Sequence, residues 1–147
     1  MASTTIIRNK TTRNYTSQSA WLSGGGGASR YEKRPSYQSS IARTVGDARG
    51  TPDIAAVADP NSGVWIYDSA AGGWIVVGGT SLATPVMAGI TNARGAFRLS
   101  SNAELTNIYN IYGNQSLYTD ITSGGCRTHR ATTHWDFCTG VGVPKGL

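Results

Sequence analysis

The stretch Gly78-Gly-Thr-Ser-Leu-Ala-Thr-Pro-Val-Met-Ala-Gly-Ile90 places two glycines and a Thr-Ser pair directly before a proline and a run of apolar residues. Glycine allows a close backbone approach and positive φ, and Pro85 is tolerated only near the start of a helix. Four apolar residues follow at the spacing of one helix face: Val86, Ile90, Ala93 and Phe97. The stretch therefore predicts a glycine-rich junction that leads into a helix.

Two roles are open to the hydroxyl groups at this junction. Thr80, Ser81 or Thr84 could cap the helix by accepting a hydrogen bond from a first-turn N–H. Ser81 could instead be a nucleophile whose attack creates an oxyanion beside those same N–H groups. Capping is the commoner role for an isolated Gly-x-Ser before a helix, so the rest of the chain must decide.

The residues before the junction read as strands. Thr51-Pro-Asp-Ile-Ala-Ala-Val-Ala-Asp59 holds five apolar residues between two aspartates, which predicts a short strand buried on both faces. Val64–Tyr67 and Trp74–Val77 predict a hairpin with a longer loop. Residues 1–19 are polar and are expected to form a strand end followed by a loop, and Trp21–Ser29 a glycine loop.

The residues after the junction give a second helix and an irregular tail. Ser101-Asn-Ala-Glu104 has the spacing of a capping box, and apolar residues follow it before Gly113. Residues 115–147 read as loops, glycines and short extended pieces. The order of elements is typical of one end of a layered α/β domain.

Composition and charge exclude several classes. The 147 residues suffice for one domain, and no window is apolar over the roughly 18 residues of a membrane span. The first residues lack the apolar segment of a signal peptide. Residues 1–50 carry eight Lys or Arg against two acids, but these are scattered without helical spacing. A solvated surface is therefore favoured over a nucleic-acid interface.

Cys126 and Cys138 flank a polar stretch that contains His129 and His134. A local disulfide is one interpretation, provided that the protein meets an oxidising compartment. A zinc site is the other, but Cys-x2-His-x4-His-x3-Cys is not a familiar ligand spacing.

Five segments, in order, resemble the sedolisin family of serine-carboxyl peptidases and cover nearly the whole chain. They are SGGGGAS (Ser23–Ser29), RPSYQ (Arg34–Gln38), TPDIAAVADPNSGVWIY (Thr51–Tyr67), GGTSLATPVMAGI (Gly78–Ile90) and DFCTGVGVPKGL (Asp136–Leu147). The resemblance implies a partial subtilisin-like α/β fold over residues 1–147, the C-terminal portion of a peptidase domain. That portion comprises a buried parallel strand, a β-hairpin, a nucleophile helix and a loop-rich calcium-binding tail.

By the same resemblance, Ser81 is the nucleophile and its own N–H helps to hold the oxyanion. The family's base is a Glu paired with an Asp on an earlier helix, and a further Asp serves the oxyanion site. Those segments are not found in this sequence, so the chain alone is expected to be inactive and its status as an enzyme stays open. A role for His129 or His134 as base is not favoured.

The tail resembles the family's calcium loop, which surrounds one ion with carboxylate and carbonyl oxygens. Carried over by position, the ligands are the Asp120 and Asp136 carboxylates and the carbonyls of Ile121, Thr132 and His134. The family has glycine at the positions of Thr132 and His134, and a side chain there resists some backbone conformations. The alternative is that both aspartates merely cap turns. Residues 115–147 form the expected calcium-loop subregion.

Several readings of the whole chain remain open. The family resemblance implies a polypeptide substrate and an extracellular location, although this chain shows no export signal. An N-terminal peptidase half could supply the missing acids, as in a split enzyme. A basic, non-catalytic module that binds a polyanion is the rival from another class. A chain that does not fold alone is the third.

Overall fold

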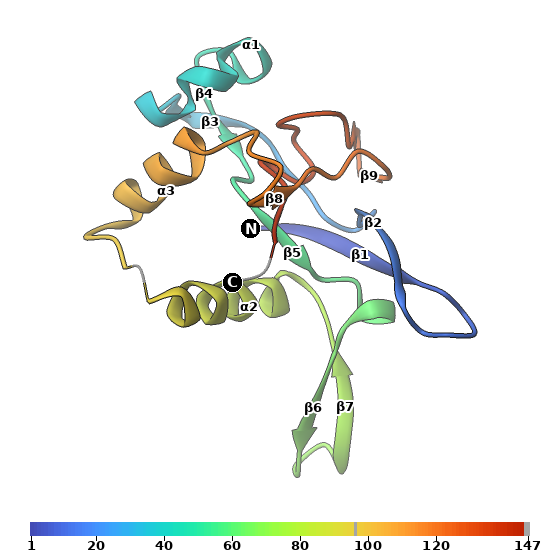
Figure 1. Ribbon diagram of the computed structural model, residues 1–147. Coiled ribbons are helices and arrows are strands. Elements are labelled where there is room, and N and C mark those ends of the chain that lie inside the picture. Colours follow the sequence, from blue (N-terminus) through green and yellow to red (C-terminus); the bar gives the residue numbers. More distant parts are fainter. Residues whose placement is uncertain (96, 146–147) are drawn as a thin grey trace.

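The computed structural model describes residues 1–95 and 97–145. Its central sheet has three strands in the order β2-β1-β5 (Figure 1). Strand β1 (Ala2–Arg8) runs antiparallel to β2 (Tyr15–Ala20) and parallel to β5 (Ala55–Val57). The expectation of a loop before Ser19 was therefore wrong, because β2 is a polar strand whose pairing with β1 supplies what its composition does not.

The predicted buried strand is confirmed in β5. Ile54, Ala55, Ala56 and Ala58 are all buried, and the small side chains let helix α2 approach closely. The strand has only three residues between the Thr51–Pro52 and Asp59–Pro60 steps, because proline supplies no N–H to a strand ladder.

Two two-stranded sheets, β3-β4 and β6-β7, accompany this sheet. Strands β3 (Gly27–Lys33) and β4 (Ala48–Thr51) pair antiparallel, and between them lie η1 (Ser36–Ile41) and α1 (Ala42–Val45). The glycine loop predicted up to Ser29 thus ends earlier, in a strand. Strands β6 (Val64–Asp68) and β7 (Gly73–Val77) follow η2 (Pro60–Ser62) and form the predicted hairpin, which projects from the body (Figure 1).

Helix α2 (Thr80–Arg94) confirms the helix predicted after the junction, and it packs on β5 and β1. Its buried residues are Leu82 and Ala83, with Val86 and Met87 half-buried behind them. The predicted apolar face was wrong in part, because the helix ends before Phe97 and that side chain is exposed. Gly95 adopts a left-handed conformation that ends the helix.

Helix α3 (Ser101–Asn110) confirms the second predicted helix. The side chain that caps it is Ser100, which accepts a hydrogen bond from the N–H of Ala103, so the expected cap at Ser101 was one residue late. Ile108 and Tyr109 are buried against η1 and the tail.

The tail is irregular, as expected, but it contributes several buried side chains to the core. Its four two-residue strands are β8 (Tyr118–Thr119), β9 (Gly125–Cys126), β10 (His129–Arg130) and β11 (Val143–Pro144). Ile121, Cys126 and Cys138 form one core cluster, and Trp135 joins the larger cluster around Tyr109. None of the described helices has the length and apolar character that crossing a bilayer requires.

Candidate functional site

The junction before α2 holds Ser81 at the mouth of the helix. The N–H of Gly79 donates to the carbonyl of Ala58, so the end of strand β5 fixes the start of the helix. A Cβ at Gly78 would meet the carbonyl oxygen of Ala58 and the ring of Pro60, each at 2.7 Å. Only glycine therefore permits this approach of backbone to backbone.

The Ser81 side chain is exposed and does not cap the helix. Gly79 occupies the N-cap position, and no side chain donates or accepts a capping bond there. The neighbouring Thr84 hydroxyl donates to the carbonyl of Thr80 at 2.9 Å, within the same helix. The capping interpretation was wrong for all three hydroxyl residues, which leaves the Ser81 hydroxyl available for another role.

The surroundings of Ser81 favour negative charge. N–H groups in the first turn of a helix have no acceptor within the helix, and the helix dipole adds partial positive charge there. The N–H groups of Thr80 and Ser81 belong to that turn. Pro85 lies in the second turn and leaves the Ser81 carbonyl without its usual helical donor.

Both histidine rings contact aromatic residues outside this junction. The ring of His129 stacks on Phe137 with 4.8 Å between centroids, and the ring of His134 lies against Tyr112. Both contacts lie in the tail region, as the sequence analysis expected.

Two of the acids before the junction have structural partners. The Asp59 carboxylate accepts hydrogen bonds from the Thr5 hydroxyl and from the N–H of Asn61, and so caps η2. The Asp53 carboxylate pairs with Arg49 at 2.6 Å and accepts from the Tyr109 hydroxyl at 2.9 Å. Both carboxylates are held by the fold, and neither is directed to Ser81 by these contacts.

A buried polar cluster around Asp53 was not predicted. Gln38 is fully buried, and its amide joins both the backbone of Gly50 and the Tyr109 hydroxyl. The indole N–H of Trp135 donates to that same hydroxyl at 3.1 Å. Burial raises the pKa of Tyr109, and the charge of Asp53 raises it further. A glutamine between tyrosine and serine carries no local signal for this role, because its partners lie far away in sequence.

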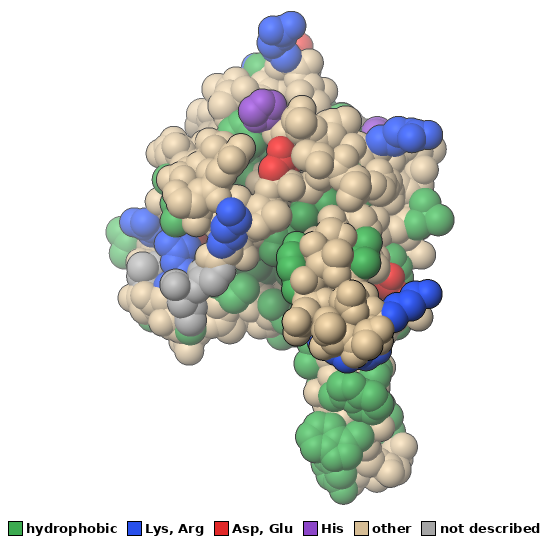
Figure 2. All heavy atoms as spheres, turned by 45° about the vertical axis from the view of Figure 1, so that its right-hand side comes forward, with side chains coloured by type: hydrophobic (Ala, Val, Ile, Leu, Met, Phe, Trp, Pro, Cys, Tyr) green, Lys and Arg blue, Asp and Glu red, His purple; other side chains and the backbone are tan. Residues whose placement is uncertain are grey.

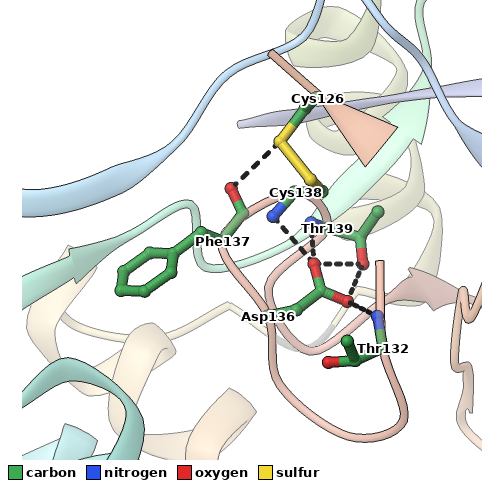
Figure 3. Close-up of a disulfide and its surroundings, with 6 residues drawn as sticks. All are labelled: Cys126, Thr132, Asp136, Phe137, Cys138 and Thr139. Carbon is green, nitrogen blue, oxygen red and sulfur yellow. Dashed lines mark hydrogen bonds between the residues drawn. A yellow bond between two sulfur atoms is a disulfide. The ribbon is translucent and has the colours of Figure 1, made fainter. Parts of the chain in front are cut away.

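The tail is cross-linked around Asp136. Cys126 and Cys138 form a disulfide with 5.4 Å between their Cα atoms, which excludes the zinc interpretation (Figure 3). Beside it, the Asp136 carboxylate accepts hydrogen bonds from the N–H groups of Cys138 at 2.7 Å, Thr139 at 2.8 Å and Thr132 at 3.0 Å (Figure 3). Burial raises the pKa of Asp136, and these hydrogen bonds oppose that rise.

Asp120 lies against the same loop. One of its carboxylate oxygens accepts from the N–H of His134 at 2.7 Å, whereas Oδ1 is buried and has no hydrogen-bond partner among the described residues. Burial raises the pKa of the Tyr112 phenol, the hydrogen bond that its oxygen accepts from the N–H of Trp135 opposes this rise, and the charges of Asp120 and Asp136 add to it. A cavity of 160 Å³ beside Asp120 is lined by Tyr112, Thr133 and His134.

The backbone at His134 has φ of 66°, the left-handed conformation that glycine prefers. His134 is one of the two positions at which the sequence analysis noted a departure from glycine. The side chain has not prevented this conformation. Thr132 is not among the residues with positive φ.

Known proteins resemble this chain over most of its length. No protein-family model matches it. It is 34% identical to kumamolisin of Bacillus sp. (strain MN-32) over 137 residues and 34% identical to sedolisin of Pseudomonas sp. (strain 101) over 144 residues. These matches cover 85% and 87% of this chain, but 24% of each relative.

A third relative and a solved structure are also similar to this chain. Xanthomonalisin of Xanthomonas sp. (strain T-22) is 37% identical over 131 residues, which are 85% of this chain and 15% of that protein. The structure of Pseudomonas sedolisin, a serine-carboxyl proteinase complexed with two molecules of pseudo-iodotyrostatin, superposes with a TM-score of 0.81 at 28% identity, over 97% of this chain and 42% of that one. The chain spans about a quarter of the length of the first two relatives, and it belongs to the sedolisin family of serine-carboxyl peptidases.

Proposed function

We propose that this chain carries the nucleophile segment of a sedolisin-type endopeptidase that acts on polypeptides, with Ser81 as the attacking group. The observation that carries the proposal is the exposed Ser81 hydroxyl at the mouth of α2, where it makes no cap. The related proteins are named as peptidases or proteinases, or carry names of that family.

The chemistry requires three parts. The Ser81 oxygen attacks the carbonyl carbon of a peptide bond, and the carbonyl oxygen becomes an oxyanion. The N–H of Ser81 is placed to donate to that oxyanion, because it belongs to the first turn of α2. A base must take the hydroxyl proton as the new bond forms, and an acid must return a proton to the leaving amine.

The base is the part that we do not assign to any of the described residues, 1–95 and 97–145. Asp53 and Asp59 are engaged in structural hydrogen bonds, and the two histidines make their contacts in the tail. We infer that a Glu/Asp pair outside these residues, on the same polypeptide or on a partner, completes the site. A serine that lacks its base loses several powers of ten in rate.

The test is proteolysis of an acid-denatured protein substrate. The 147 residues alone are expected to give no turnover, whereas the completed protein is expected to cleave and to lose its activity with Ser81→Ala. Thr84→Ala is the matched control, because it removes an exposed hydroxyl from the same helix. Turnover by the 147 residues that Ser81→Ala abolishes would overturn the inferred need for a separate base. Unchanged cleavage by the completed Ser81→Ala protein would overturn the proposal for Ser81.

We further propose that the tail binds one calcium ion. The Asp120 and Asp136 carboxylates and the carbonyls of Ile121, Thr132 and His134 would hold it. The buried, unpartnered Oδ1 of Asp120 supports the proposal, since a hard cation satisfies such an oxygen. The ion would supply charge neutralisation and cross-linking of the tail, and no chemical step depends on it.

Calcium titration followed by calorimetry and thermal melting tests this site. Binding heat and a rise in melting temperature are expected for the wild type and are expected to be lost with Asp120→Asn. Asp68→Asn is the control, because Asp68 caps a turn at the hairpin tip. An equal response of wild type and Asp120→Asn would contradict the site.

The disulfide supports a location in an oxidising compartment, and we propose an extracellular one. Binding of a nucleic acid, the polyanion that the basic residues first suggest, has less support. Basic side chains lie apart from one another on the face that Figure 2 shows, whereas a nucleic-acid surface usually gathers them in one stripe.

A further inference from the structure

A groove lies between the β1–β2 hairpin and the β6–β7 hairpin, and its lining residues include none of those assigned to catalysis or calcium. Its volume is 400 Å³. The β1–β2 hairpin contributes two arginines, η2 contributes an amide and a hydroxyl, and the β6–β7 hairpin contributes apolar side chains. These residues are Arg8, Arg13, Asn61, Ser62, Trp65 and Val76.

Two hydrogen bonds join the elements that line the groove. The Ser62 hydroxyl accepts a hydrogen bond from the N–H of Ile6 at 2.9 Å, which ties η2 to strand β1. A second tie joins the same elements, since the Thr5 hydroxyl donates to the Asp59 carboxylate at 2.8 Å. A ligand would therefore meet a preorganised wall, which reduces the entropic cost of binding.

The charge of the groove is positive. Arg8 and Arg13 are exposed, and neither forms an ion pair with a carboxylate of residues 1–95 or 97–145. No acidic residue is among the lining residues. The nearest acid along η2, Asp59, is 6% exposed and its oxygens accept hydrogen bonds from the protein. The groove is thus complementary to a ligand with negative charge.

An apolar face continues outward from the groove. In the hairpin register Trp65 lies opposite Val76, and Tyr67 lies opposite Trp74, so all four side chains share one face. The three aromatic side chains are 64–65% exposed, and the rings of Tyr67 and Trp74 contact edge to face at 5.6 Å. Hydrophobic side chains cover the projecting lobe in Figure 2. Contiguous exposed aromatics of this kind mark interaction sites.

The hairpin also offers backbone partners. Within the described residues β6 and β7 pair only with each other, so each strand has an outer edge with unpaired N–H and C=O groups. An extended peptide can add to such an edge.

We propose that this groove and the aromatic face bind an acidic polypeptide segment in extended form. Carboxylates of the segment pair with Arg8 and Arg13, and its apolar side chains pack on the face of Trp65, Tyr67 and Trp74. A nucleic-acid strand fits less well, because only two cations line the groove and no run of them tracks a phosphate backbone. The inference is independent of the chemistry proposed for Ser81.

The probe is a fluorescent decapeptide of alternating Glu and Phe, titrated with the full-length protein and followed by anisotropy. The comparison probes are the same peptide with Lys in place of Glu and a single-stranded oligothymidylate of equal charge. The Glu peptide is expected to bind, to weaken as salt is raised, and to bind more tightly than either comparison probe.

Three variants locate the site, and two control variants accompany them. Arg8→Glu is expected to weaken binding of the Glu peptide about tenfold or more, and Arg13→Glu gives a second measurement of the same charge. Trp65→Ala is expected to weaken it by a similar factor, about tenfold. Arg30→Glu and Tyr31→Ala are the matched controls on exposed residues of β3, and circular dichroism confirms that each variant keeps its fold.

Four outcomes would overturn the proposal. They are the absence of binding, equal binding of the Lys peptide, tighter binding of the oligothymidylate, and binding of the Glu peptide that is unchanged in folded Arg8→Glu, Arg13→Glu and Trp65→Ala proteins.

Discussion

Helix α2 and the tail of residues 115–145 combine regularity and burial in opposite ways. Helix α2 is regular over Thr80–Arg94, yet most of its side chains beyond Leu82 and Ala83 remain accessible. The tail has only two-residue strands, yet Ile121, Trp135 and Asp136 are buried. Helical hydrogen bonds make the backbone of α2 self-sufficient, whereas the tail needs side chains and a disulfide to satisfy and hold its backbone.

The difference matches the two roles that we propose for these regions, nucleophile for Ser81 and calcium loop for the tail. An attacking hydroxyl must reach a substrate, so it belongs on an open and self-supporting element. A metal-binding loop must hold oxygen atoms in place, so it gains from cross-links and from buried hydrogen bonds. Substitutions of the same kind are therefore expected to act differently in the two regions.

Gly140→Ala is expected to have the largest effect. Gly140 has φ of 63°, and a Cβ there would overlap the backbone oxygen of Asp53. Neither the strain nor the overlap can be relieved by a side-chain movement, so we expect a loss of about 4 kcal/mol in the free energy of unfolding. Urea denaturation measures it, and a loss below about 1 kcal/mol would show that the tail is looser than described.

Removal of the disulfide is expected to cause the second-largest loss in the free energy of unfolding. Cys126 and Cys138 are separated by 12 residues, and a cross-link of that span stabilises a fold by about 3 kcal/mol. The double Ser variant is expected to lose this amount in urea denaturation without reductant. The control is the wild type in reductant, which should match the variant; a variant as stable as the oxidised wild type would contradict the ranking.

Tyr109→Phe tests the anchor between the tail and the core. Its hydroxyl accepts from Gln38 and Trp135 and donates to Asp53, so its loss leaves buried donors unpaired and is expected to cost about 2 kcal/mol at neutral pH.

The same variant has a pH signature. Burial raises the pKa of Tyr109 above its ordinary value of 10.0. The folded state then keeps a proton that the unfolded chain loses, so this stabilisation is complete below pH 10 and declines as the pH rises toward the folded pKa, by about 1.4 kcal/mol per unit. Stability curves from pH 8 to 11 should therefore converge for wild type and Tyr109→Phe, and parallel curves would contradict this assignment.

Gly89→Ala is expected to have the smallest effect, and of opposite sign. A Cβ at Gly89 would meet no atom within 4 Å, and alanine favours a helix over glycine by about 0.5–1 kcal/mol. Thermal melting should show a small gain in stability. A clear loss would show that another surface covers this face of α2 in solution, and it would remove the contrast between the two regions.

Local patterns predicted the elements that depend on neighbouring residues. The glycine pair before α2, the apolar run of β5 and the hairpin of β6 and β7 all carry their signals within a few positions, and all are present. Strand β2 escaped prediction because Thr16, Ser17 and Gln18 look like a loop until β1 pairs with them. Phe97 fitted the helical spacing, but the left-handed Gly95 ends the helix first.

The candidate site likewise has parts that local sequence predicted and parts that only tertiary contacts established. The order of residues by itself determined that Ser81 follows two glycines into a helix, because that signal depends on a short span of chain. It left the two cysteines open between a disulfide and a zinc site. Tertiary structure alone decided that Gly79 rather than a hydroxyl residue caps α2, and that Gln38, Asp53, Tyr109 and Trp135 meet. Such contacts join residues far apart in sequence, and burial, which no local pattern specifies, makes them obligatory.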